Sequence, residues 1–158
     1  MSNNLDMFLK AAARVVIIGM GNELRGDDAV GLQVIRLLKP YENDRLTVFE
    51  GHMMPETFVA PACAKKPTHL LIVDAAELGG PPGTWRLLTS DELDESIFTT
   101  HSIPTTAMAT EIQHRCGSQV MFLGIQPKQR EITLSLSKEC QQAARDIVRS
   151  LQHSLHLQ

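Results

Sequence analysis

The chain has 158 residues, of which 43% are hydrophobic and 21% charged, a composition typical of a globular domain rather than of a disordered segment. A formal net charge of −3, with only five Phe, one Tyr and one Trp, argues against a nucleic-acid-binding surface, which needs clustered cations and rings for base stacking. No apolar run approaches the roughly 20 residues that a membrane span needs, so we expect no membrane insertion.

Strand and helix patterns alternate along the chain, and no linker or internal repeat divides it. Short apolar runs bounded by turn residues predict buried strands, and apolar residues at helical spacing predict helices between them. In chain order we expect a strand at 14–20, a helix at 28–39, a strand at 46–51, a short irregular helix within 53–66, strands at 69–76 and 84–89, a helix start at 90–93, a loop at 99–104, a helix at 105–115, a strand at 119–127 and a final helix from about residue 137.

This alternation predicts a single α/β domain, a three-layer α/β/α sandwich around a twisted, mostly parallel sheet of about five strands. We expect its core to span about 14–155, with 1–13 as an N-terminal extension. In such sheets, ligands bind beyond the carboxyl ends of the strands. A functional site is therefore expected where those strands end.

Three cysteines, Cys63, Cys116 and Cys140, are far apart and form no C-x-x-C pair. Neither a zinc clip nor a disulfide framework is indicated, and we expect three reduced thiols. Residues 1–14 contain Asp6 and no long apolar stretch, which does not fit a signal peptide. We accordingly expect a cytoplasmic protein, and nothing in the sequence demands more than a monomer.

The segment GMGNELRGDD after the first predicted strand resembles a phosphate-binding turn. Gly19 and Gly21 fit the dinucleotide fingerprint G-x-G-x-x-G, but Leu24 stands at the third glycine position and no Gly-Lys-Ser/Thr follows. Asp27 and Asp28 would also repel a phosphate. A nucleotide-binding module is therefore the weakest alternative. An N-cap role for the following helix would explain one aspartate and leave the other unexplained.

Carboxylates follow two of the predicted strands, and a later loop carries an imidazole. Asp28 lies in the turn after the first strand, Asp74 ends the strand LLIVD, and His101 lies in the loop TTHSIP. Each has an ordinary structural explanation, as a helix cap, a solvated carboxylate or an exposed histidine. Together, these oxygen and nitrogen donors suit a divalent transition metal with open coordination positions.

Four blocks of the chain, GMGNELRGDDAVG, HLLIVDAAELGGPPGTWRLL, TTHSIP and VMFLGIQP, resemble in order and spacing the maturation endopeptidases of NiFe-hydrogenases. The type that serves hydrogenase 3 and energy-converting hydrogenases is the most similar, over about residues 14–151. The resemblance implies an α/β/α sandwich that removes the C-terminal extension of the hydrogenase large-subunit precursor by one peptide cleavage, after nickel has been inserted.

The resemblance also implies which residues act. Matched motif to motif, the catalytic residues that bind the nickel presented by the precursor are Asp28, Asp74 and His101. Relatives usually have Asp-Gly-Gly or similar after the second strand, whereas this chain has Glu50, Gly51 and His52. His52 is then either an additional ligand or a polar surface residue.

Two mechanisms fit these residues. In one, Asp28 is the general base that activates water; in the other, the metal polarises the carbonyl or the water directly. The backbone from Gly19 to Asn22 is a candidate oxyanion donor. No serine or cysteine stands in a matching motif beside a base, so no covalent nucleophile is indicated. The alternative function is a non-catalytic nickel or hydrogenase chaperone on the same fold, which would bind the precursor without cutting it.

Overall fold

The computed structural model describes residues 2–93 and 105–158. Its elements, with η for a 3-10 helix, are α1 (Ser2–Leu9), β1 (Val15–Met20), η1 (Gly26–Ala29), α2 (Val30–Leu38), η2 (Lys39–Tyr41), β2 (Leu46–His52), η3 (Pro55–Phe58), α3 (Val59–Ala64), β3 (His69–Ala75), β4 (Trp85–Leu88), η4 (Ser90–Glu92), α4 (Thr105–Cys116), β5 (Gln119–Ile125) and α5 (Lys138–Leu155). Each predicted strand and helix is confirmed, whereas the predicted loop at 99–104 lies outside the described residues. None of the described helices combines the length and apolar character needed to cross a bilayer.

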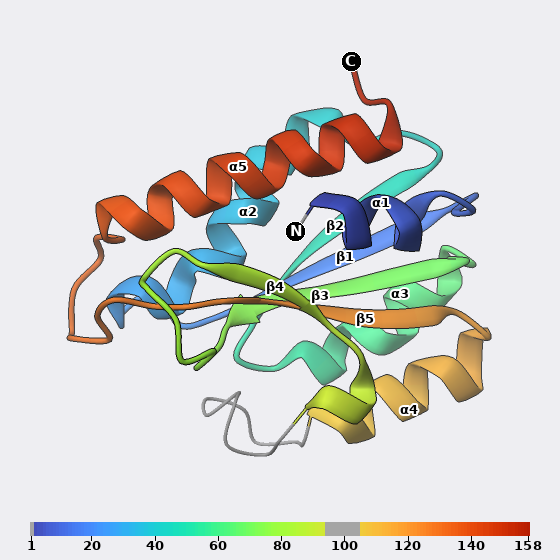
Figure 1. Ribbon diagram of the computed structural model, residues 1–158. Helices are drawn as coiled ribbons and strands as arrows, with labels where there is room; N and C mark the ends of the chain where they lie inside the picture. The colour runs from blue at the N-terminus through green and yellow to red at the C-terminus, as the bar shows by residue number, and fades with distance from the viewer. Residues whose placement is uncertain (1, 94–104) are drawn as a thin grey trace.

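A five-stranded sheet runs through the molecule in the order β2-β1-β3-β5-β4 (Figure 1). The first four strands of that order are parallel, and β4 runs antiparallel at one edge. Helices α1, α2 and α5 cover one face, and α3 and α4 cover the other. The predicted three-layer α/β/α sandwich around a mostly parallel sheet is therefore confirmed.

The central strands are buried on both faces, which is why their sequences read as continuous apolar runs. Every residue of β1 and β3 is buried, including Asp74 near the carboxyl end of β3. Alternate side chains of β1 enter opposite cores: Val15 and Ile17 pack beneath α1, α2 and α5, and Val16 and Ile18 pack beneath α3 and α4. The two cores hold the sheet rigidly, and with it the ends of its strands.

The strand order reverses between β1 and β3. Strand β2 pairs with one side of β1, and β3 pairs with its other side. In open parallel sheets, the ligand-binding crevice lies at the carboxyl ends of the strands where the order reverses. The topology therefore points to the turn after β1 and to the end of β3.

The segment expected as an N-terminal extension, residues 1–13, carries α1. Helix α1 contacts α5, and its side chains Leu5 and Leu9 are buried. The ring of Phe8 meets the His69 ring at the start of β3, with centroids 5.0 Å apart. Because these apolar residues recur three and four positions apart, the helix presents one apolar face to the core.

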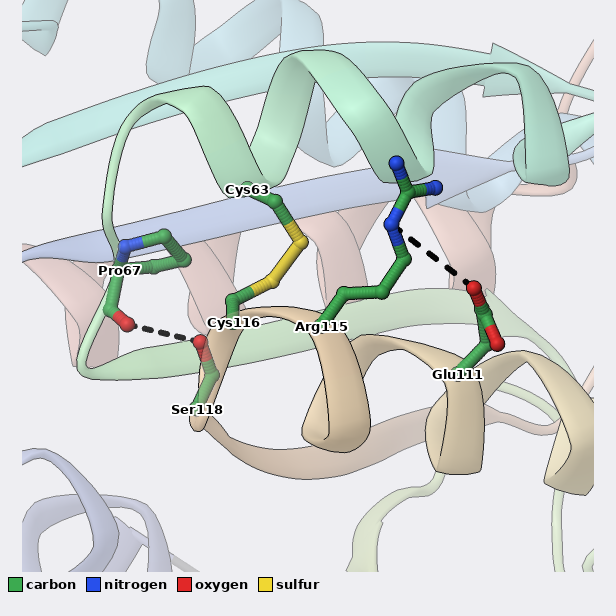
Figure 2. The surroundings of a disulfide bond; sticks show 6 residues. All are labelled: Cys63, Pro67, Glu111, Arg115, Cys116 and Ser118. Atoms are coloured by element: carbon green, nitrogen blue, oxygen red, sulfur yellow. Dashed lines mark hydrogen bonds and ion pairs between the residues drawn. A yellow bond between two sulfur atoms is a disulfide. The ribbon is translucent and has the colours of Figure 1, made fainter.

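Cys63 and Cys116 form a disulfide that joins the ends of α3 and α4 (Figure 2). The expectation of three reduced thiols is wrong for this pair, because the fold brings Cα atoms 53 residues apart in the sequence to within 5.3 Å. Cys140 is a buried thiol in α5, and burial raises its pKa to about 11. Such a thiol stays protonated at neutral pH and does not act as a nucleophile.

We expect reduction of the Cys63–Cys116 disulfide to lower the free energy of unfolding by about 2–4 kcal/mol, because the crosslink restricts the unfolded chain. Urea denaturation with and without a reductant, followed by circular dichroism, measures the change. The control variant with Cys63→Ser and Cys116→Ser should unfold like the reduced wild type and ignore the reductant. An unchanged wild-type midpoint on reduction would contradict the prediction.

Candidate active site at the carboxyl ends of β1 and β3

The turn after β1 packs η1 and α2 directly against the end of the sheet. Gly21 has a φ of 142°, and a Cβ atom there would lie 1.9 Å from the carbonyl oxygen of Asp28. A Cβ atom on Gly31, in the first turn of α2, would lie 2.4 Å from the carbonyl oxygens of both Met20 and Val73. These glycines therefore permit close packing of backbone on backbone, and that packing sets Asp28 over the reversal between β1 and β3.

Asp28 is buried, yet one oxygen of its carboxylate has no hydrogen-bond partner among the described residues. That oxygen is Oδ1, whereas Oδ2 accepts a hydrogen bond of 3.2 Å from the backbone N–H of Asn22. Arg130 places its Nε atom 3.9 Å from Oδ1, which suits an ion pair but is too long for a hydrogen bond. Because native structures rarely leave a buried polar atom unsatisfied, this oxygen is a candidate for contact with a ligand.

Asp74 lies on β3, the strand that pairs with β1 at the reversal of strand order. It is buried at the end of β3, and its Oδ1 accepts a hydrogen bond of 2.8 Å from the backbone N–H of Ala75. Strand β3 pairs with β1 up to Gly19 and Val73, and η1 contacts β3. The structure thus brings together the two carboxylate-bearing segments that the sequence placed at strand ends.

The third predicted site residue, His101, lies outside the described residues. Within residues 2–93 and 105–158, no three His, Cys, Asp or Glu side chains cluster closely enough to hold a metal ion. The assignment of His101 as the third donor therefore stays a prediction.

Asp27 is buried beside Asp28 but has a structural role. Its carboxylate accepts three backbone N–H groups, at 2.7–3.1 Å, from Lys128, Gln129 and Ser137. Burial opposes ionisation, but the hydrogen bonds from Ser137 and Lys128 outweigh it and lower the pKa of Asp27. The N-cap explanation is wrong, because α2 has Ala29 at its N-cap, η1 has Arg25, and neither helix has a side-chain cap.

A polar network extends from Arg130 to the segment after β3. Its guanidinium Nη1 lies 3.3 Å from Oε1 of Glu77, whose Oε2 accepts a hydrogen bond from Gln126. Gln126 in turn accepts the backbone N–H groups of Leu78 and Gly79. Sequence reasoning did not single out these residues, although Gln126 and Glu77 lie in blocks that carry the family resemblance.

His52 and Glu50 belong to a surface charge cluster. The half-exposed side chain of His52 has its Nδ1 atom 3.8 Å from a carboxylate oxygen of Glu23. Arg36 pairs with both Glu23 and Glu50. The carbonyl oxygen of His52 accepts the N–H of Gly21, so its backbone supports the turn after β1. These contacts favour a surface role for the His52 side chain.

Comparison with known proteins gives a consistent set of relatives. A family model described as hydrogenase maturation protease matches residues 32–153. A putative hydrogenase maturation protease of Methanocaldococcus jannaschii is 33% identical over 128 residues, which cover 76% of each chain. The hydrogenase 3 maturation protease of Escherichia coli K12 is 33% identical over 113 residues, covering 71% of this chain and 72% of that protein. The crystal structure of a NiFe hydrogenase maturation protease from Thermococcus kodakarensis has a TM-score of 0.89 at 27% identity, covering 97% of this chain and 99% of that one.

We expect Asp27→Asn to lower the free energy of unfolding by about 2–4 kcal/mol. The NH2 group of the new amide cannot accept a hydrogen bond, so it would leave at least one backbone N–H donor without an acceptor. Asp28→Asn should leave stability unchanged or raise it, because one oxygen of this buried carboxylate has no hydrogen bond among the described residues. Urea denaturation measures both. Asp146→Asn, on the exposed side of α5, is the control and should shift stability by less than about 0.5 kcal/mol. Equal losses for Asp27→Asn and Asp28→Asn would contradict this division of roles.

Proposed function

Since this chain belongs to the hydrogenase maturation protease family, we propose that it removes the C-terminal extension of a hydrogenase large-subunit precursor after nickel insertion. The observation that carries the proposal is the placement of Asp28 and Asp74 at the carboxyl ends of the adjacent strands β1 and β3. Oδ1 of Asp28, which no donor in the described part of the chain satisfies, gives this pair a group that can contact a substrate.

Nickel enters the proposal as part of the substrate. Carboxylate oxygens from Asp28 and Asp74, with the imidazole of His101, are donors that suit a divalent transition metal with open positions. Oδ1 of Asp28 is buried and has no hydrogen-bond donor within residues 2–93 and 105–158, which fits contact with a cation. The protease would complete the coordination of nickel already held by the precursor, so a nickel-free precursor would lose these contacts and bind weakly.

In the proposed mechanism, Asp28 accepts a proton from the water that attacks the scissile carbonyl. Arg130 faces Asp28 and is itself held by Glu77, so the charge of the carboxylate is partly offset before substrate arrives. The alternative, in which nickel polarises the carbonyl or the water, uses the same aspartates. A thiol mechanism has no support at Cys140, whose pKa is raised to about 11 by burial.

Mass spectrometry of a large-subunit precursor, incubated with this protein before and after nickel loading, tests the proposal. Loss of a C-terminal peptide from the nickel-loaded sample alone is the expected result. Cleavage of both samples would show that the enzyme does not need nickel in the precursor, and the proposed recognition of nickel would be wrong. Stable binding without cleavage would instead favour a chaperone.

We expect Asp28→Asn to reduce kcat/KM on the nickel-loaded precursor by at least about 100-fold, the usual contribution of a general base. The same mass-spectrometric assay, run as a time course, measures the rate. Asp146→Asn and Cys140→Ser are controls that should cleave at the wild-type rate. Wild-type cleavage by Asp28→Asn would show that the assignment of Asp28 is wrong, and a strong loss in Cys140→Ser would revive a thiol mechanism.

A further inference from the structure

Two segments that are far apart in the sequence pair at the edge of the candidate site. Arg25 and Thr133 form an isolated parallel bridge. Thr133 accepts a hydrogen bond from the N–H of Gly26 and donates one to the carbonyl of Leu24. We call residues 24–26 and 132–134 the rim ribbon.

The rim ribbon exposes apolar side chains. Leu24, Ile132 and Leu134 are 60%, 92% and 79% exposed, respectively. Thr133 is only half-exposed, and its Cγ2 atom would lie 3.2 Å from a Cβ atom on Gly26. Ile132 and Leu134 flank Thr133 in the chain and are both far more exposed than it. The ribbon therefore keeps a polar residue partly buried and its apolar residues in solvent, the reverse of the usual pattern at a surface.

Half of the exposed large hydrophobic side chains in the described residues gather on this ribbon: they are three of six. Single exposed apolar side chains are common on any protein, whereas several on backbone segments that pair with each other indicate an interaction site. The arrangement is also preformed, because Asp27 binds the N–H groups of Lys128, Gln129 and Ser137 on either side of residues 132–134. A surface that is already ordered loses little conformational entropy when a partner binds.

The ribbon adjoins the site through two covalent connections. Residues 24–26 lead directly into η1, where Asp28 follows Asp27. Residues 132–134 lie in the loop that carries Arg130, whose Nε atom is 3.9 Å from Asp28. A folded substrate that presents a peptide bond to Asp28 would therefore meet the ribbon as well.

We propose that the rim ribbon docks an apolar surface patch of the folded large-subunit precursor, next to the extension that is cut. This inference rests on the proposed function. A second copy of this chain is the other candidate occupant, but three side chains fall far short of the roughly 800 Å² per partner that a standard stable interface buries. A small, preformed patch beside the reacting groups suits an enzyme that must release its product.

Ile132→Glu tests the proposal, with Leu134→Glu as a second variant and Met7→Glu as the matched control. Met7 is 70% exposed and lies on α1, which contacts the start of β3, at the end of the strands away from the candidate site (Figure 1). All three changes replace an exposed apolar side chain, so none should disturb folding, which circular dichroism checks. Surface plasmon resonance on immobilised nickel-loaded precursor measures Kd, and the cleavage assay measures KM and kcat.

We expect Ile132→Glu and Leu134→Glu each to raise Kd and KM at least about fivefold, the effect of losing about 1 kcal/mol of binding, with kcat nearly unchanged. Met7→Glu should match the wild type. Wild-type Kd and KM in both ribbon variants would overturn the docking proposal and leave the proposed function standing.

The remaining outcomes separate the two proposals. The wild type could bind the precursor without cutting it, while Ile132→Glu no longer binds. That result would support the docking surface and overturn the protease function. A precursor that the wild type does not bind at all would overturn both. Sedimentation velocity tests whether a second copy of this chain binds the ribbon. If Ile132→Glu dissociates a dimer of this chain and binds precursor like the wild type, the ribbon is a self-association surface and the docking proposal is wrong.

Discussion

The buried carboxylate of Asp27 holds together the two loops on which the site depends. A buried charge is costly unless hydrogen bonds satisfy it, and here three backbone N–H groups do so. Those donors belong to the loop after β5, so the turn after β1 and that loop form one rigid unit. The rigid unit positions Asp28 and Arg130 and presents the exposed side chains of the rim ribbon.

Two adjacent aspartates therefore have opposite local energetics. Asp27 is fully satisfied and stabilises the fold, whereas one buried oxygen of Asp28 has no hydrogen-bond donor among the described residues. Under-satisfied groups of this kind persist where function requires them and where the surrounding structure offsets their cost. The hydrogen bonds of the neighbouring Asp27 carboxylate hold this turn of backbone in place and so help to offset that cost.

Three of the segments that carry the family resemblance meet at the carboxyl ends of the parallel strands. The turn after β1 contains Asp28, the end of β3 contains Asp74 and leads to Glu77, and β5 leads to Gln126. Gln126 bonds to Glu77, and Arg130 lies between Glu77 and Asp28. Blocks that are separated in the sequence thus form one connected polar network, which gives the candidate site its framework. The Cys63–Cys116 disulfide joins the two helices of one layer, so it stabilises the sandwich without contributing a reactive thiol.

The sequence by itself determined the alternation of strands and helices, the layered fold and the placement of Asp28 and Asp74 at strand ends. Continuous apolar runs are required by strands buried on both faces, and parallel sheets gather ligand-binding residues where those strands end. Only the tertiary structure decided which aspartate is structural, which cysteines pair and where Arg130 lies. Each of those outcomes depends on partners 53 to 110 residues away, and no local pattern of side chains specifies contacts at that separation.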